Sequence, residues 1–544
     1  MIVLWLYTLL CHQLLTLVPH QINGHVVASG TTGSDRVVIV GAGIGGLAAA
    51  VDLAARGVAV TVVERAPDPG GRMRRVAVAN TRIDAGPTVL TMRWVFDALF
   101  ADAGTSVEDH LTLRPAGILA RHAWSEDERL DLFASLEESV DAVAAFAGPD
   151  EARRFRAFCA EAQTIYKTLE GPFLKDSRPG PFDLARRIGF GRLGALWRIR
   201  PYETMWGALS GHFRDPRLRQ LFGRYATYCG SSPWQAPATL MLVAHAEREG
   251  VWLVDGGMHR LAAAMASLAE RLGATLRYGT GVSAIEVSGG RATGVTLEDG
   301  EVIAAHAVIS NADVSALAAG LLGPAVSRGT PGTPRRHRSL SALTWSLVAP
   351  TSGFPLVRHS VFFSPDYRAE FDDLFKRDRL PADPTVYVCA QDRDDAGQRS
   401  GTGAERLLMI VNAPANGDLR TLDPDEVARC ENATFERLRR CGLAVDLDPM
   451  ACERTTPADF NRLFPGTGGA IYGRASHGWT ASFARPGSRS RMPGLYLAGG
   501  STHPGPGVPM AALSGRLAAA SLLQDLASTR PSRRAAMSGG TSMH

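Results

Sequence analysis

The sequence lacks the features of a disulfide-bonded or metal-binding protein. Its 544 residues contain seven cysteines, and none of them forms a Cys-x-x-Cys pair or another spacing typical of metal ligands. An odd and scattered set of this kind indicates reduced, buried thiols in a cytosolic protein. A serine–histidine–aspartate arrangement typical of hydrolases is also missing. We therefore expect neither a disulfide framework nor a metal site.

The chain also has little excess charge. Its formal net charge is +4 at pH 7, with 45% hydrophobic and 21% charged residues. This composition is ordinary for a globular protein that is long enough for two or three domains. Because so small a charge is spread over the whole chain, a dedicated nucleic-acid-binding protein is excluded.

Positive charge is absent from the first 35 residues. No lysine or arginine precedes Arg36, whereas a secretory signal begins with a positive segment. The apolar run Ile2–Val18 is interrupted at Cys11–Gln13 and is shorter than the roughly 20 apolar residues of a spanning helix. We interpret residues 1–35 as an upstream start or a disordered extension. A membrane anchor and an export signal are the competing interpretations.

A glycine-rich loop begins at Gly41. The apolar run Val37–Val40 before it predicts a buried parallel strand, and Leu47–Ala55 after it predicts an alanine-rich helix. Ala59–Val63 then predicts a second strand, which ends at Glu64. This strand–loop–helix–strand order is typical of dinucleotide-binding folds.

Each glycine of the loop has an expected role. Gly41 permits a tight turn, Gly43 lets the backbone approach a pyrophosphate, and Gly46 allows close packing of the helix on the strand. The pyrophosphate would lie at the helix N-terminus, where free N–H groups favour an anion. Glu64 is placed to accept hydrogen bonds from ribose hydroxyls. We predict a dinucleotide held at Gly41, Gly43, Gly45, Gly46, Glu64 and Arg65.

A second glycine pair bears on which dinucleotide is bound. Gly70, Gly71 and Arg72 follow the second strand closely and suit a loop across the same pyrophosphate, with Arg72 neutralising its charge. A surface turn with a solvated basic cluster would give the same pattern. Residues 465–473 lack a preceding strand, so no second nucleotide fold is expected. One resident cofactor, which we expect to be FAD, would pass its electrons to a diffusing acceptor such as oxygen or a quinone.

The C-terminal part repeats the order of strand, glycine loop and helix. Leu495–Ala498 predicts a short strand, and a helix is predicted from about Pro509 to Leu526. The N-terminus of such a helix can stabilise negative charge on a reduced flavin ring. We therefore place five further residues at the cofactor: Gly499, Gly500, Gly507, Val508 and Pro509.

With these motifs the sequence resembles the FAD-dependent amine-oxidase and phytoene-desaturase superfamily. Glu64 with the Gly71-Arg72 segment is similar to its extended fingerprint, and residues 494–508 are similar to the C-terminal motif of bacterial-type phytoene desaturases. Residues 254–313 also fit, and the resemblance implies that Val282 lends backbone contacts to the adenine. The likeness extends over residues 36–527. Pro506 departs from the pattern, which has a small residue there.

Within this superfamily the chain is most similar to the 1-hydroxycarotenoid 3,4-desaturases, the hydroxyneurosporene and methoxyneurosporene desaturases. The similar segments are residues 84–104, 250–261 and 503–516. The resemblance implies an FAD-dependent oxidoreductase of carotenoid biosynthesis that acts on CH–CH groups. It would introduce the C3–C4 double bond of 1-hydroxyneurosporene or 1-hydroxylycopene, with hydride transfer to the flavin.

Several different functions stay open at this level, because no single residue selects a 1-hydroxy end group. A phytoene desaturase, a flavin-dependent carotenoid isomerase and an amine oxidase all share the flavin fold. A prenyl-lipid escort protein of the same fold would be a non-enzymatic binding protein. The intact Glu64 and the C-terminal glycine loop favour a redox flavin over that binding function.

We expect an α/β fold with a Rossmann-like FAD-binding domain and an inserted α+β substrate domain. The FAD-binding domain takes residues 36–109, 253–338 and 481–527. The insertions are a helical, membrane-facing region at 110–252 and the substrate domain at 339–480, where alternating runs predict strands. Residues 528–544 are expected to be a disordered tail.

A basic segment suggests contact with a membrane. Residues 184–200 contain five arginines, a tryptophan and no acidic residue, and such a segment can lie in an anionic interface. We therefore hypothesise a cytoplasmic protein attached peripherally to the cytoplasmic membrane. A helix packed on the core with a solvated basic face would show the same composition.

The residue that takes the proton in a desaturation is not readable from the sequence. His503 is the best-placed ionisable candidate, because it lies in the loop before the flavin-facing helix. It could instead make a hydrogen bond that orders this loop. Asp84 and Arg93 are weaker candidates that equally suit a turn and a surface position.

Overall fold

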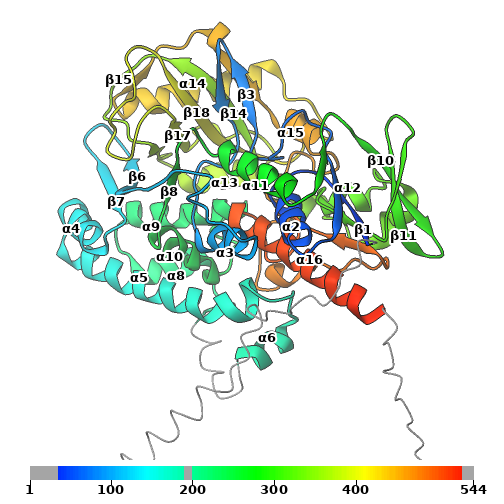
Figure 1. Ribbon diagram of the computed structural model, residues 1–544. Coiled ribbons are helices and arrows are strands. Elements are labelled where there is room, and N and C mark those ends of the chain that lie inside the picture. The colour runs from blue at the N-terminus through cyan, green and yellow to red at the C-terminus, as the bar shows by residue number, and fades with distance from the viewer. Residues whose placement is uncertain (1–34, 189–198, 530–544) are drawn as a thin grey trace, which may run out of the picture.

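The computed structural model describes residues 35–188 and 199–529 (Figure 1). The predictions for the leader (residues 1–35) and for the C-terminal tail (residues 528–544) concern residues that lie almost wholly outside these ranges. Residues 189–198, the greater part of the basic segment, also lie outside them. The cysteines that are described are all free, as predicted.

A parallel sheet of five strands lies in the segments predicted as the FAD-binding domain, and it confirms the predicted Rossmann-like α/β class. Its order is β21 (Leu495–Leu497), β13 (Ala307–Ser310), β1 (Arg36–Val40), β2 (Ala59–Val63) and β9 (Thr275–Arg277). The central strand β1 pairs in parallel with β13 and β2. Three segments far apart in the sequence therefore meet in one sheet.

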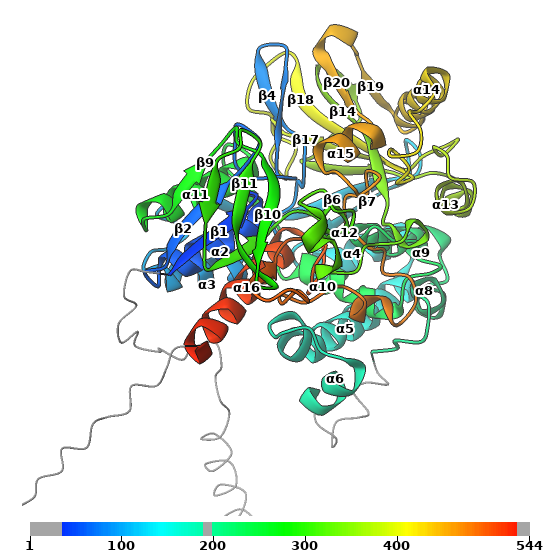
Figure 2. The same ribbon diagram turned by 90° about the vertical axis from the view of Figure 1, so that its right-hand side faces the viewer.

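The two faces of this sheet are covered differently. Val37 and Ile39 pack against helices α2 (Ile44–Ala54), α11 (His259–Arg271) and α16 (Val508–Thr529). Val38 and Val40 pack against an antiparallel sheet of β10 (Val282–Ser288), β11 (Arg291–Leu297) and β12 (Val302–Ala304), which Figure 2 shows beside the parallel sheet. Successive strand residues point to opposite faces, so the continuous apolar run predicted a strand buried on both sides.

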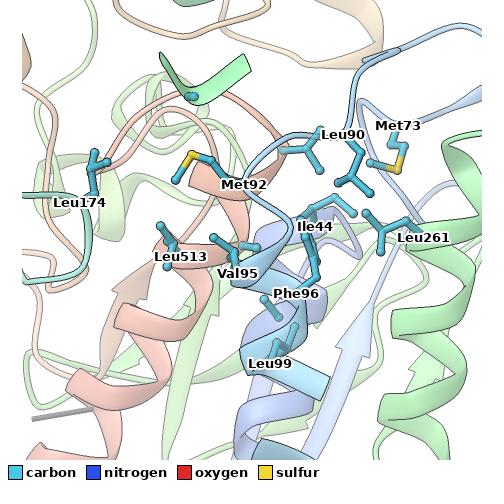
Figure 3. Packing of buried hydrophobic residues seen from close by; sticks show 14 of the residues in the cluster. Ile44, Met73, Leu90, Met92, Val95, Phe96, Leu99, Leu174, Leu261 and Leu513 are labelled. Atoms are coloured by element: carbon cyan, nitrogen blue, oxygen red, sulfur yellow. The ribbon is translucent and has the colours of Figure 1, made fainter. Parts of the chain in front are cut away.

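The helical layer is tightly packed around α2. Figure 3 shows Val95, Phe96 and Leu99 of α3 (Trp94–Asp102) directed toward Ile44, with Leu513 of α16 nearby. Where α2 and α16 cross, a Cβ on Gly515 would lie 2.0 Å from the Gly45 carbonyl oxygen. Only glycine fits at this crossing.

A second sheet, of seven strands, lies mostly in the segment predicted as the substrate domain. Its order is β20 (Cys452–Thr455), β14 (Ser341–Ala349), β18 (Glu405–Ala413), β17 (Val386–Ala390), β16 (His359–Phe362), β6 (Ile118–Ala123) and β7 (Arg129–Phe133). The last two strands come from the insertion that was expected to be mostly helical. They join this sheet because β6 pairs in parallel with β16, whose residues follow more than 200 positions later.

The remainder of the first insertion is helical and lies at the lower side of Figure 1. It comprises α4 (Leu136–Ala147), α5 (Pro149–Leu169), α6 (Pro181–Ile188), α8 (Met205–His212), α9 (Pro216–Gly223) and α10 (Leu242–Arg248). Of the helices in the described ranges, none is both long enough and apolar enough to cross a bilayer.

Smaller elements connect these layers. The short pairs are β3 (Arg75–Val78) with β4 (Thr81–Asp84), β5 (Leu113–Pro115) with β8 (Trp252–Val254), and β15 (Thr351–Gly353) with β19 (Leu443–Val445). The further helices are α12 (Val314–Ala318), α13 (Tyr367–Phe375), α14 (Pro424–Arg440) and α15 (Pro457–Leu463).

The crossing of α2 and α16 gives a test of the fold. We expect Gly515→Ala to lower the free energy of unfolding by about 1–3 kcal/mol, because the added methyl group forces the helices apart. Thermal or denaturant unfolding of the full chain measures this change. Gly211→Ala is the matched control, since Gly211 also lies in a helix but a Cβ there would meet open space. Equal stability of both variants would contradict the packing argument.

Candidate functional site

A cavity of about 820 Å³ extends from the glycine-rich loop to the seven-stranded sheet. This volume is near the upper end of the roughly 300–1,000 Å³ typical of ligand pockets. The predicted cofactor residues that line it are Gly41, Gly43, Gly45, Glu64, Arg65, Gly71, Arg72, Val282, Gly499, Gly500, Gly507, Val508 and Pro509. Gly46 and His503 are the two predicted site residues that do not line it. The structure thus brings together residues that are more than 400 positions apart.

The second glycine pair crosses the first loop, as the sequence suggested. The Gly70 N–H donates to the Ala42 carbonyl at 2.8 Å. A Cβ on Gly71 would lie 3.2 Å from the Gly43 Cα atom. The two loops therefore touch through their backbones, and little room is left for side chains between them.

Asn311, at the end of β13, lies directly under the glycine-rich loop. A Cβ on Gly43 would lie 2.6 Å from its Nδ2 atom, and a Cβ on Gly45 would lie 2.7 Å from its Oδ1 atom. A Cβ on Gly46 would lie 2.1 Å from the Gly41 carbonyl oxygen, which explains why Gly46 packs under the loop and not along the cavity. The contact of Asn311 with this loop was not predicted from the sequence.

The N-terminus of α2 is free to receive an anion. Its N-cap residue, Gly43, has no side-chain cap, and no acidic residue lies in the first turn. The carboxylate of Glu64 is held beside this end, because it accepts hydrogen bonds from the backbone N–H groups of Ala42 at 2.7 Å and Ala66 at 2.8 Å. Each carboxylate oxygen retains a lone pair for a further donor such as a ribose hydroxyl.

Arg72 lies beside the glycine-rich loop, and not all of its N–H donors have a hydrogen-bond partner. Its Nη2 atom lies 3.2 Å from Asp313 Oδ2, and its guanidinium lies 4.8 Å from the ring centre of Phe464. Its buried Nε atom has no hydrogen-bond partner. A buried donor without a partner is costly, so this nitrogen indicates an acceptor that binds here.

The C-terminal glycine loop lies against the N-terminal one. A Cβ on Gly45 would lie 2.8 Å from the Gly499 nitrogen, and the Gly499 N–H donates to Ser514 Oγ of α16 at 2.7 Å. Arg485 donates to the Gly500 carbonyl and to the Tyr472 carbonyl, both at 3.1 Å. These bonds fix the loop that leads into the first turn of α16.

His503 does not line the cavity. Its Nε2 atom lies 3.0 Å from the Asp176 carbonyl oxygen, and its ring packs edge-on against Phe173. Burial lowers the pKa of His503 to about 4. This geometry supports the loop-ordering role, and the catalytic role stays a prediction without support.

The two weaker candidates also lie outside the cavity wall. Asp84 accepts a hydrogen bond from the Met258 N–H at 2.6 Å, near the start of α11, and burial raises the pKa of its carboxyl. Arg93 pairs with Asp97 at 3.0 Å. Both contacts are structural, as a turn residue and a surface residue would make.

Sequence reasoning missed the polar side chains in the other half of the cavity. Arg224, Tyr228, Tyr367, Tyr387 and Thr344 line it, and they come from one helical region, a further helix and two strands. No motif or spacing distinguishes them from surface residues of the same types. Only the tertiary structure brings them together.

The residues present fit FAD. The backbone cradle at Gly43 and Gly45, the uncapped helix end and the unpartnered Arg72 nitrogen suit a pyrophosphate. Glu64 and Val282 lie in the wall on the adenosine side, while the C-terminal glycine loop and α16 are placed for the flavin ring.

Comparison with known proteins agrees with this site. Residues 44–523 match the family described as flavin containing amine oxidoreductase. Hydroxyneurosporene desaturase from Rubrivivax gelatinosus is 57% identical over 93% of this chain and 97% of its own length. Hydroxyneurosporene desaturase from Cereibacter sphaeroides is 48% identical over 91% of this chain and 98% of its own. A solved oxidoreductase from Methanosarcina mazei shares the fold, with a TM-score of 0.56 at 16% identity, over 90% of this chain and all of that one.

The position of Arg72 predicts an effect on cofactor binding. We expect Arg72→Gln to weaken FAD binding by about ten- to a hundredfold, because a charge-assisted hydrogen bond to the pyrophosphate is lost. Titration of the apoprotein with FAD, followed by flavin fluorescence, measures the Kd. Arg82→Gln is the control, since Arg82 also pairs with a carboxylate but lies on the surface. Unchanged affinity in Arg72→Gln would remove this arginine from the cofactor site.

Proposed function

The chain belongs to the family of flavin-containing amine oxidoreductases, and from this membership we propose that it is an FAD-dependent desaturase of carotenoids. The membership confirms the relationship that the glycine motifs predicted. Within the family, the relatives named above are carotenoid desaturases that match nearly the whole chain. They favour a CH–CH oxidoreductase of carotenoid biosynthesis over an amine oxidase and over a prenyl-lipid escort protein.

The observation that carries the proposal is the character of the cavity beyond the C-terminal glycine loop. Apolar side chains continue along it from the loop, among them Leu174, Leu240, Leu242, Val243 and Ile471. The acidic residues among its described lining are Glu64, Glu298 and Asp313, and all three belong to the nucleotide end. Among the described residues, the part of the cavity lined by these apolar side chains has no carboxylate that could bind a cationic amine. Its apolar wall suits a polyene instead.

The chain's own residues bind and orient such a substrate. Each buried CH₂ group contributes roughly 0.8 kcal/mol to binding, so a long apolar passage holds a molecule that has no polar group in its middle. Its walls also exclude water from the reacting bond. When bound, FAD supplies the acceptor for the hydride. The first turn of α16 lines the cavity, and a helix N-terminus there would favour negative charge on the reduced flavin ring.

The finer assignment is a 1-hydroxycarotenoid 3,4-desaturase. It is supported by the identity of 57% and 48% to the two hydroxyneurosporene desaturases, over most of the chain. The single nucleotide-binding sheet in the described ranges further supports a diffusing electron acceptor, oxygen or a quinone, rather than a bound nicotinamide.

Substrate choice tests this function. We expect the purified protein, supplied with FAD in liposomes, to shift the absorption of 1-hydroxyneurosporene to longer wavelength, because its conjugation is extended. Phytoene and lycopene in parallel samples should remain unchanged. Turnover of phytoene alone would contradict the 1-hydroxycarotenoid assignment. Anaerobic samples with and without a quinone separate the two acceptors.

We also propose that the protein acts at the surface of the cytoplasmic membrane, with α6 in contact with lipid. This helix lies at the edge of the molecule (Figures 1 and 2). Phe182 at its start is 91% exposed, and Arg186 lies in its last turn. An exposed aromatic residue one helical turn from a cation suits an anionic interface.

The attachment is tested by vesicle flotation. We expect Phe182→Ser combined with Arg186→Glu to reduce binding to vesicles of phosphatidylcholine and phosphatidylserine several-fold, because both the apolar and the charged contact are lost. Met450→Ser is the control, since Met450 is 88% exposed but lies between β19 and β20, at the other end of the molecule (Figure 2). Equal flotation of the double variant and the unaltered protein would refute attachment through α6.

A further inference from the structure

The half of the cavity formed by the seven-stranded sheet contains a group of polar side chains in an otherwise apolar wall. Thr344 of β14 and Tyr387 of β17 both pair with Ile410 of β18, so the three side chains lie in one row across the same face. All three line the cavity, together with Tyr367 of α13 and Arg224. An apolar polyene alone gives no reason for this group.

Two of these hydroxyl groups have no partner. Tyr367 is 6% exposed and Thr344 is 3% exposed, and neither the Tyr367 Oη nor the Thr344 Oγ1 atom makes a hydrogen bond. A buried polar group without a partner costs about 1–3 kcal/mol. Because both residues line the cavity, a ligand that enters it can satisfy them.

Arg224 adds donors to the same group. Its side chain makes one hydrogen bond among the described residues, from Nη1 to the Tyr228 hydroxyl at 3.3 Å. None of the carboxylates in the described ranges lies within 4.0 Å of its guanidinium. It lies instead over the rings of Tyr228 and Tyr387, at 5.3 and 5.4 Å from their centres. Several of its N–H groups are therefore left for a ligand.

The surroundings of Arg224 favour a neutral ligand over an anionic one. The Tyr228 hydroxyl that accepts from Arg224 donates in turn to Glu247 Oε1 at 3.1 Å. Glu247 also accepts a hydrogen bond from Tyr225. The Glu247 carboxylate is thus linked to the Arg224 guanidinium through the Tyr228 hydroxyl. Its negative charge would repel a carboxylate on the ligand.

Tyr387 forms a fixed wall of the pocket. Its hydroxyl is within 2.7 Å of both Thr88 Oγ1 and His359 Nδ1. Burial lowers the pKa of His359 to about 3, so this histidine is neutral and holds the tyrosine in place. The donors and acceptors left for a ligand are therefore those of Arg224, Tyr367 and Thr344.

We propose that Arg224, Tyr367 and Thr344 form a pocket that recognises the alcohol group of the substrate and so determines specificity for hydroxylated polyenes. The alcohol oxygen accepts a hydrogen bond from the Arg224 guanidinium, and the alcohol O–H donates to the hydroxyl of Tyr367 or Thr344. This inference rests on the proposed function, since it names the feature of the substrate that the same cavity selects.

The place of the pocket suits a reaction close to the alcohol. Burial raises the pKa of Tyr472 to about 12, and the positive charge of Arg224 acts against this rise. Arg224 therefore lies near Tyr472. The Tyr472 carbonyl shares its donor, Arg485, with the Gly500 carbonyl of the flavin-facing loop. The C1 carbon that bears the alcohol is two bonds from C3, so the C3–C4 bond lies close to the bound alcohol.

The test compares two carotenoids that differ in one hydroxyl group. The ratio of kcat/KM for 1-hydroxyneurosporene to that for neurosporene is measured for the holoenzyme and for Arg224→Met, Tyr367→Phe and Thr344→Val. We expect the ratio to fall about ten- to a hundredfold in Arg224→Met, because its donors are lost while much of the length of the side chain is kept. The other two variants should lower it about three- to tenfold. Ile410→Val, in the same row, is the control and should leave it unchanged.

A second measurement separates this inference from the proposed function. Quenching of flavin fluorescence gives the Kd of both carotenoids without turnover, and the hydroxylated one should bind more tightly only when the three polar residues are present. Flavin content and Tm identify any variant that fails to fold, and Tyr367→Phe and Thr344→Val remove only one oxygen or exchange it for a methyl group. Unchanged ratios in folded variants would overturn the pocket. Tighter binding of the alcohol by a protein that desaturates neither carotenoid would support the pocket and contradict the proposed function.

Discussion

The structure depends on the contact of backbone with backbone at the carboxyl edge of the parallel sheet. There the glycine-rich loop after β1 touches the Gly70–Gly71 loop on one side and the Gly499 loop on the other, with Asn311 beneath it. These contacts leave little or no room for a Cβ at Gly45 and Gly71, so glycine at these positions lets the loops approach one another. The same closeness leaves N–H groups and two helix ends exposed to one cavity, and this is the arrangement that a dinucleotide requires.

The rest of the molecule extends the cavity. The antiparallel sheet β10–β12 and the helices around α2 bury the two faces of the parallel sheet, which fixes the direction of its carboxyl edge. The seven-stranded sheet and the helical region then form walls beyond that edge. Polar groups are concentrated at the nucleotide end and around Arg224, while apolar side chains line the remainder of the cavity. The division fits a substrate that is apolar along its length and polar at one end.

The cofactor half of the site could be predicted because its information is local. A buried strand, a glycine loop and a helix follow one another within twenty residues at Val37–Leu47, and again at Leu495–Val508. The local pattern therefore predicts the strand–loop–helix geometry of both segments. The helix and strand boundaries differ from the predicted ones by a few residues at most, as at α2, which begins at Ile44.

The other half depends on pairing across long separations, which no local pattern encodes. Strands β6 and β7 occur in an insertion that is otherwise helical, and only their pairing with β16 reveals them. Arg224 resembles the many surface arginines of the chain until the fold places it in the wall of the same cavity as Thr344 and Tyr367. For His503 the sequence offered two roles, and the contacts of its ring with Asp176 and Phe173 support the loop-ordering one.

The edge strand β21 and helix α16 come from the last part of the described chain, and both belong to the cofactor site. The first glycine loop is therefore synthesised long before the segment that completes its cradle. Until β21 and α16 have been synthesised, the first loop lacks the segment that closes its cradle. A premature stop codon before Leu495 would remove β21 and α16, and with them the flavin-facing part of the cofactor site. It would leave a polypeptide that is correct in sequence up to the stop but carries no prosthetic group.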